Sequence, residues 1–310
     1  MRAFGHYLMS GRLQAVFSIS LLSLVAMFIT PMAYLLSGTP IGLISLRRGP
    51  LIAMQVMLGC LLVVLVLLLL AGLTPGIAIA FALGIWLPVW FCSMVLRSTQ
   101  SQGIMILSTG MIGLIYVLVT YAMFGDVQAM WRNVLFALIE NAMTTARADQ
   151  VKPVIEQLVP YMNAAMASGL VTSIALTVML ARWWQSWVFN PGGFRQEFIA
   201  LRLPRGLLVP VAAGTALILA TDTAIEPIVR DVLILTLFLY VFHGVSVVHG
   251  IVAVRRASRW WLFAMYFALV FFSLQAVLFV ACIGISDSLF RLTPVAIKPP
   301  DDDNTPDDRD

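Results

Sequence analysis

Long runs of apolar residues, each closed by a short polar segment, dominate the chain. The clear runs cover residues 51–73, 75–96, 103–124, 160–181, 231–254 and 260–286. Each run is close to the roughly 20 residues that a helix needs to cross a hydrocarbon core about 30 Å thick. Because backbone polar groups find no water in hydrocarbon, a run of this length predicts a spanning α-helix. The pattern therefore predicts an all-α, polytopic transmembrane helical bundle.

Two regions divide less simply into spans. Residues 206–221 form one short span, and residues 13–46 are apolar over 34 positions with an interruption at Pro31. The second stretch is too long for one crossing. We divide it into spans at 13–29 and 32–46, which form a tight N-terminal helical hairpin and bring the prediction to about nine spans.

The distribution of charge predicts the orientation, because arginine and lysine collect in short cytoplasmic loops. With the N-terminus inside, the cytoplasmic segments carry twelve arginines and one acid, Glu197, whereas the outer segments carry seven basic residues and fourteen acids. A single span over 13–46 would invert this bias. We therefore predict a multi-pass protein of the bacterial inner (cytoplasmic) membrane, with a cytoplasmic N-terminus and the C-terminus outside.

Composition narrows the class further. Of the 310 residues, 61% are hydrophobic and 11% are charged, whereas soluble domains carry about 25% charged residues. This composition excludes a water-soluble enzyme and a nucleic-acid-binding domain. The cysteines, Cys60, Cys92 and Cys282, lie in apolar runs without a CxxC spacing, so we predict no metal site, no disulfide and no cofactor.

One transmembrane domain is expected over residues 1–290. Its outer segment, 126–158, carries two amphipathic stripes that predict helices lying on the outer face or capping the bundle. Residues 291–310 are rich in Pro and Asp and predict a disordered acidic tail.

His243 is the sharpest candidate for chemistry, because it falls at the middle of a predicted span, where an ionisable side chain is costly. His249 lies on a different face of the same helix, which weakens a relay between the two. A hydrogen bond across helices is the simpler interpretation, and Gln275 lies at a similar depth. No acid falls at the middle of a predicted span. Glu226 and Asp231 are interpreted as a solvated helix end or, alternatively, an outward-facing ligand site.

Small residues at helical spacing favour close helix contact. Gly76, Ala80 and Gly84 form such a stripe, for packing within the bundle or against a partner subunit. Gly110 and Gly113 indicate the same more weakly.

The cytoplasmic stretch 182–205 is the most distinctive in the chain. It combines an aromatic interfacial anchor, a sharp Asn-Pro-Gly-Gly turn and an amphipathic segment. We predict that it docks to inner-leaflet lipid or to a membrane or cytoplasmic partner. The residues assigned to this docking are Trp183, Trp184, Asn190, Pro191, Gly192, Gly193, Phe194, Glu197 and Arg202.

This stretch resembles the YybS-like family of uncharacterised bacterial membrane proteins. The resemblance rests on Trp183-Trp184, Asn190-Pro191-Gly192-Gly193-Phe194, Glu197-Phe198 and Leu201-Arg202-Leu203, with Met9–Ala15 and Leu46–Gly49 fitting the same pattern. It covers most of residues 1–290. The family is distantly similar to the substrate-binding S-components of energy-coupling-factor vitamin transporters and, more loosely, to the rod-shape protein MreD. The resemblance therefore implies an S-component-like core.

We expect a transport-related protein that binds a small molecule from the outer side, beneath residues 126–158, and acts with a partner. The expected lining residues are Trp131, Glu140, Asn141, Tyr161 and Asn163, with His243 deeper. The alternative is a non-transporting envelope scaffold or assembly protein that recruits partners through its cytoplasmic loop. We do not expect an enzyme, because the sequence carries no nucleophile–base set.

Overall fold

The computed structural model describes residues 2–28, 34–142, 145–220 and 225–292. This part of the chain is helical throughout and contains no strand, which confirms the all-α prediction. Within these described ranges, five helices are long and apolar enough to cross a membrane: Pro50–Leu70, Gly76–Thr99, Gln102–Phe124, Asp149–Phe189 and Glu226–Val254. Shorter apolar helices cover Arg12–Ala26, Arg205–Ala220, Trp260–Phe271 and Leu274–Phe290. The predicted acidic tail lies outside the described residues from position 293 onward.

The N-terminal part begins with α1 (Arg2–Ser10) and α2 (Arg12–Phe28), followed by the π-helical η2 (Tyr34–Gly38) and α3 (Thr39–Arg48). These segments correspond to the two arms of the predicted hairpin, whose joint at 29–33 lies outside the described residues. The second arm is the more central, because every residue of α3 from Thr39 to Leu46 is buried. A Cβ at Gly42 would lie 2.8 Å from the Cβ of Ala181, so α3 and the long helix α9 (Thr145–Phe189) approach closely.

The next three predicted spans are present as helices. They are α4 (Pro50–Leu70), the continuous run of α5 (Gly76–Phe81), η3 (Ala82–Trp86) and α6 (Leu87–Thr99), and α7 (Gln102–Phe124). The π-helical segment η3 precedes Pro88. Since proline has no N–H to donate to the carbonyl four residues earlier, the helix relaxes its pitch there instead of breaking.

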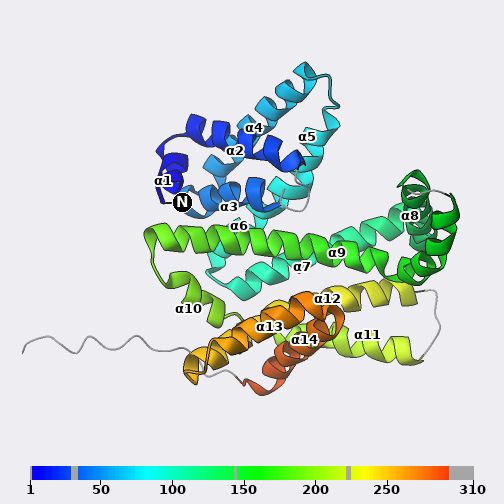
Figure 1. Cartoon of the computed structure of the whole chain (residues 1–310). Helices are drawn as coiled ribbons and strands as arrows, with labels where there is room; N and C mark the ends of the chain where they lie inside the picture. The colour runs from blue at the N-terminus through cyan, green and yellow to red at the C-terminus, as the bar shows by residue number, and fades with distance from the viewer. Residues whose placement is uncertain (1, 29–33, 143–144, 221–224, 293–310) are drawn as a thin grey trace, which may run out of the picture.

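A helical cap closes one end of the bundle. It consists of α8 (Val127–Ala142) and the first turns of α9, which Figure 1 shows together at the far end of the long green helix. Ion pairs hold the two together: Arg132 Nε lies 2.9 Å from Glu156 Oε1, and Lys152 Nζ lies 3.2 Å from Glu140 Oε1. The predicted stripes of 126–158 are thus helical. We call this the α8 end of the bundle.

The opposite end carries α10 (Gly193–Ile199), and we call it the α10 end (Figure 1). The chain continues through η4 (Arg205–Leu207), α11 (Leu208–Ala220) and α12 (Glu226–Val254). Helix α12 is central, with α7, α9, α11 and α14 (Ser273–Phe290) packed around it. Gly110 and Gly113, which the sequence indicates only weakly, do make tight contacts between helices. A Cβ at Gly110 would lie 2.5 Å from Leu239 Cδ1, and one at Gly113 would lie 2.5 Å from Val171 Cγ2.

The stronger small-residue stripe faces open space instead. A Cβ added at Gly76 or at Gly84 would meet nothing within 4 Å. Close contact at these two glycines within the bundle is therefore not observed. Gly76 lies in α5, where Ala78 is the one buried residue, and Gly84 lies in η3 on a face that Ala82, Ile85 and Trp86 do not share.

The prediction of one continuous span over 260–286 is wrong. The helix breaks at Phe272, whose φ of −117° and ψ of 47° separate α13 (Trp260–Phe271) from α14. Twelve residues of α13 rise only about 18 Å, too little to cross about 30 Å of hydrocarbon. Figure 1 shows α13 and α14 folded back on each other. The fold-back seats α14 against α12, where a Cβ at Gly244 would collide with the carbonyl oxygen of Val280.

Candidate functional site

A closed polar network lies toward the α8 end of the bundle. Asn163 Nδ2 donates a hydrogen bond of 2.7 Å to Asp231 Oδ2, and the Tyr121 hydroxyl donates one of 3.1 Å to the same oxygen. Trp131 Nε1 lies 3.5 Å from Asn163 Oδ1 at the edge of hydrogen-bonding range. Asp231 is 0% exposed and its Oδ1 has no hydrogen-bond partner among the described residues. The network joins α7, α8, α9 and α12.

The interpretation of Asp231 as part of a solvated helix end is therefore wrong. Helix α12 begins at Glu226, so Asp231 lies more than one turn inside it and faces α7 and α9. Its neighbour Arg230 is directed elsewhere. That guanidinium donates to Glu226 Oε1 at 2.8 Å and to the carbonyl oxygen of Pro160 at 3.0 Å. The sequence does carry a signal for this arrangement: Glu226 and Arg230 are spaced i,i+4 and can pair with each other, which leaves Asp231 without a charged partner on its own helix.

The structure gathers only part of the ligand site expected beneath 126–158. Trp131 and Asn163 meet, but Asn141 is exposed on α8 and Glu140 pairs with Lys152 on the surface. Tyr161 is exposed, with the Arg230 guanidinium 5.4 Å from its ring centroid. Glu140, Asn141 and Tyr161 therefore do not line a common pocket with Asn163, which is buried and hydrogen-bonded to Asp231.

His243 belongs to a second, separate cluster. It lies twelve residues beyond Asp231 on α12, about 18 Å along the helix axis. Its Nε2 is 3.1 Å from Asp287 Oδ2 and its Nδ1 is 3.3 Å from Ser288 Oγ. Both His243 and Asp287 are at most 2% exposed. The expected partner, Gln275, is exposed instead.

The burial of Asp287 does not follow from the predicted spans, in which this acid lies just beyond the run over 260–286. The reason is the break at Phe272, because a straight helix over 260–286 would leave residue 287 beyond its end. Folding α14 back places Asp287 beside His243. Arg205, at the start of η4, donates to the Ser288 carbonyl oxygen at 3.0 Å and holds the end of α14 in place.

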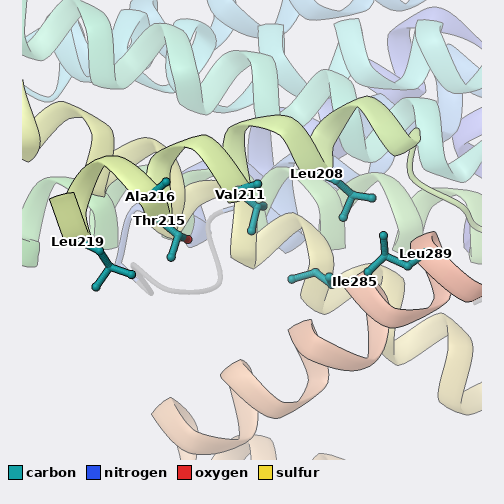
Figure 2. A pocket seen from close by; sticks show the side chains of 8 residues that line it. Leu208, Val211, Thr215, Ala216, Leu219, Ile285 and Leu289 are labelled. Carbon is teal, nitrogen blue, oxygen red and sulfur yellow. The ribbon is translucent and has the colours of Figure 1, made fainter.

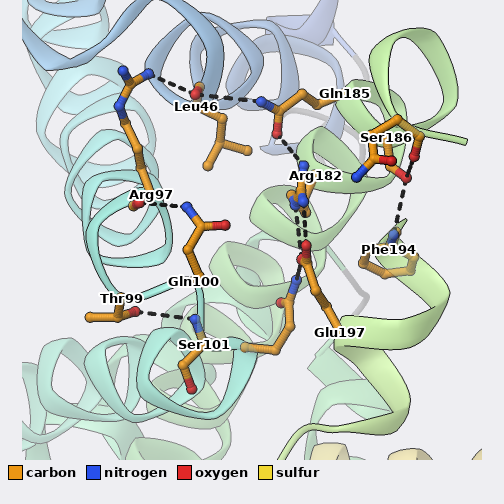
Figure 3. A network of polar contacts seen from close by, with 12 residues as sticks. Leu46, Arg97, Thr99, Gln100, Ser101, Arg182, Gln185, Ser186, Phe194 and Glu197 are labelled. Carbon is orange, nitrogen blue, oxygen red and sulfur yellow. Dashed lines mark hydrogen bonds and ion pairs between the residues drawn. The ribbon is translucent and has the colours of Figure 1, made fainter. Parts of the chain in front are cut away.

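A polar network anchors the Asn-Pro-Gly-Gly loop to the body of the protein (Figure 3). Arg182 of α9 forms a two-point ion pair with Glu197 of α10, and its Nε lies 2.8 Å from Oε2. Gln102 of α7 donates to the same carboxylate at 3.3 Å. Arg97 of α6 donates at 2.7 Å to the carbonyl oxygen of Leu46 at the end of α3. The loop is therefore fixed by elements from both halves of the chain.

The turn itself is locally well supported. Ser186 Oγ donates to the Asn190 carbonyl oxygen at 2.6 Å and accepts from the Phe194 backbone N–H at 3.0 Å. Gly192 has a φ of +92°, which a residue with a Cβ rarely adopts. Asn190, Pro191 and Gly192 are exposed.

The remaining residues assigned to docking differ in exposure. Trp184 is buried against the N-terminal helices, and Phe194 packs on the core. Gly193 and Arg202 are half-buried. Trp183 is exposed and stacks on Trp187, with ring centroids 5.7 Å apart. Their docking role stays a prediction.

An apolar surface groove of about 500 Å³ lies between α11 and the end of α14 (Figure 2). Leu208, Val211 and Thr215 come from α11, and Ile285 and Leu289 come from α14. The groove contains no charged side chain.

A larger cleft of about 790 Å³ lies toward the α10 end, and we call it the α13 cleft. Its walls come from α9, α10, α12, α13 and α14, and they include Leu176, Met179, Phe242, Val245, Leu269 and Val277. Arg195, His249 and Tyr266 also line the cleft and carry polar groups, as do Thr172 and Trp183. His249 Nε2 lies 2.9 Å from the Tyr266 hydroxyl, and Phe198 presents its ring to His249 at 5.4 Å.

Sequence reasoning missed this cleft, although Trp183 and Phe194 at its rim were singled out. Tyr266 and Val277 reach it only because the chain folds back at Phe272. A periodicity argument that assumes one straight helix has no means of placing them there. Among the described residues, no group of three or more His, Cys, Asp or Glu side chains is placed to hold a metal ion.

No family model, no curated protein and no solved structure matches the chain. The class rests on the fold and its hydropathy: the described residues are all-α and include five helices long and apolar enough to cross a membrane. The resemblance to the YybS-like family stays a prediction.

Proposed function

We propose that the protein binds an amphiphilic molecule, taken sideways from the membrane, in the α13 cleft. The observation that carries the proposal is the cleft itself, which is apolar along its walls and polar at one end. Its volume falls within the range of roughly 300–1,000 Å³ that is typical of ligand sites. The closed packing of Asp231 and Asn163 argues against the site first expected beneath 126–158 and favours this one.

The position of α13 supports entry from the lipid. None of its residues is buried, so one side of the cleft is formed by a helix that packs only lightly on the body. Its one side-chain hydrogen bond to α12 in the described part of the chain joins Tyr266 to His249. A chain-shaped ligand therefore meets few packed side chains on its way between α13 and α9.

The role that we propose is transport-related, with a partner supplying energy, in the bacterial inner membrane and without catalysis by this chain. The N-terminus is proposed to be cytoplasmic, with the α10 end at the cytoplasmic face. The fold-back of α14 changes the proposed position of the chain end. Since Arg205 holds Ser288, the end of α14 would lie on the same side as the arginine-rich loops, and not outside.

A scaffold role is the second candidate. The observation that favours it is the Trp183–Trp187 stack, which is exposed beside the exposed Asn190–Gly192 turn at the α10 end. Exposed aromatic pairs of this kind suit contact with a partner or with the membrane interface.

The test uses the purified full-length protein and native mass spectrometry of molecules that stay bound after extraction. Leu176→Trp fills the cleft, whereas Leu118→Trp places the same bulk on an equally exposed leucine of α7. The two leucines are 46% and 49% exposed, and Leu118 lines neither of the two cavities described above. We expect a bound amphiphile in the wild-type protein and in Leu118→Trp, and its loss in Leu176→Trp.

Equal retention by the two variants would refute binding in this cleft. A wild-type protein that carries no amphiphile and gains no thermal stability from added lipids would refute binding altogether. If it also lost a co-purified protein on Trp183→Ala, the scaffold role would be favoured.

A further inference from the structure

We infer that the α13 cleft selects a membrane lipid with an anionic phosphate headgroup, which Arg195 binds at the α10 end. This inference rests on the proposed function, because it names the class of amphiphile that the same cleft holds. It is carried by an unpaired guanidinium and an unused hydrogen-bond donor at the polar end of an otherwise apolar cleft.

Arg195 is available for an anion. It is exposed, and none of the ion pairs in the described part of the chain includes it. The carboxylate nearest in sequence, Glu197, is paired with Arg182 of α9. A guanidinium presents two parallel N–H groups, a geometry that suits a phosphate better than a point charge does.

His249 and Tyr266 add a donor at the same end. Their hydrogen bond uses one hydrogen, but a neutral imidazole and a phenol together carry two. Whichever group donates across the 2.9 Å contact, one N–H or O–H is left for a ligand oxygen. Arg195, His249 and Tyr266 all line the α13 cleft, so the donor and the guanidinium face the same ligand.

The apolar walls do not provide the selectivity. Lipid tails are as apolar as leucine, so a lipid chain that moves from the bilayer into the cleft gains no hydrophobic free energy. Discrimination must come from the headgroup. One basic residue near an anionic lipid favours binding by about fivefold, which corresponds to about 1 kcal/mol.

The experiment is a competition for the purified full-length protein between equal amounts of dioleoylphosphatidylglycerol and dioleoylphosphatidylcholine, read by native mass spectrometry. The two lipids share their chains and differ in headgroup charge. We expect the wild-type protein to favour phosphatidylglycerol by about fivefold or more, and Arg195→Gln to lose that preference while still binding both lipids. The matched control is Arg12→Gln, another exposed arginine with no ion pair in the described part of the chain, which keeps the preference.

Two further arms separate the outcomes. Tyr266→Phe retains the ring but loses the hydroxyl, and we expect it to reduce the preference about twofold. Glycerol phosphate, added in excess, should not displace the lipid; displacement would assign the site to a soluble phosphate and overturn the inference.

Equal binding of the two lipids by the wild-type protein, with both lost in Leu176→Trp, would overturn the headgroup inference and leave the proposed function intact. Retention of neither lipid by the wild-type protein would overturn both.

Discussion

The hydrogen bond between Asn163 and Asp231 allows a quantitative test of the polar network. Replacing Asn163 with leucine, which is close in size, removes the 2.7 Å donor and leaves the Tyr121 hydroxyl at 3.1 Å as the remaining donor to the carboxylate. A hydrogen bond to a charged group contributes about 1.5–3 kcal/mol, whereas polar pairs between membrane helices average about 0.6 and reach about 1.7 kcal/mol. Because Asp231 is 0% exposed, we expect Asn163→Leu to lower the free energy of unfolding by about 2 kcal/mol, where the upper end of the second range meets the lower part of the first.

The assay is equilibrium unfolding in mixed micelles of a mild detergent and dodecyl sulfate, applied to a double-mutant cycle. Asn163→Leu and Asp231→Leu are each measured alone and then together. We expect the double variant to be at least about 1 kcal/mol more stable than the sum of the two single losses predicts, because it leaves neither the carboxylate of Asp231 nor the amide of Asn163 buried without the other. The loss of the Tyr121 hydrogen bond is common to Asp231→Leu and the double variant and cancels in the cycle. Asn141→Leu, at an exposed asparagine of α8, should change stability by no more than about 0.5 kcal/mol. Additivity of the two single changes within about 0.5 kcal/mol would refute the network as a source of stability.

Three further predictions concern α12, α14 and the chain end. Gly244→Leu should prevent α14 from packing on α12 and give aggregated protein on size-exclusion chromatography. The control Gly169→Leu, at a glycine where a Cβ meets nothing within 4 Å, should elute as the wild type does. Equal elution of the two variants would contradict the close crossing of α12 and α14. His243→Leu removes the imidazole beside the buried carboxylate of Asp287 and should lower the free energy of unfolding by about 3 kcal/mol in the same micelle assay. His243→Gln, which keeps a polar group there, should lower it less. Equal losses in the two variants would mean that the pair adds no stability. Fusions placed after Phe290 should give a fluorescent green fluorescent protein and an inactive alkaline phosphatase, and the reverse pattern would show that the chain end lies outside.

Much of the helix pattern is readable from the sequence, because each spanning helix must satisfy its own backbone in hydrocarbon and therefore appears as one long apolar run. The runs at 51–73 and 103–124 correspond to α4 and α7 within a few residues. The candidate sites were less readable. Trp131 and Asn163 do meet, but their hydrogen bonds lead to the carboxylate of Asp231, which the sequence places near the start of an apolar run and leaves as either a solvated helix end or an outward-facing ligand site.

By itself, the sequence determined the all-α class, the positions of most helices in the described residues and the arginine bias on which the proposed orientation rests. Only the tertiary structure decided that residues 260–290 fold back, that Asp287 meets His243, and that a cleft opens beside α13. These features cannot be read from hydropathy, because hydropathy measures only the transfer of a segment into lipid. Phe272 and its neighbours are equally apolar whether the helix continues or turns. Which of the two occurs depends on the close approach of Gly244 and Gly284, a contact between helices that no single run of residues encodes.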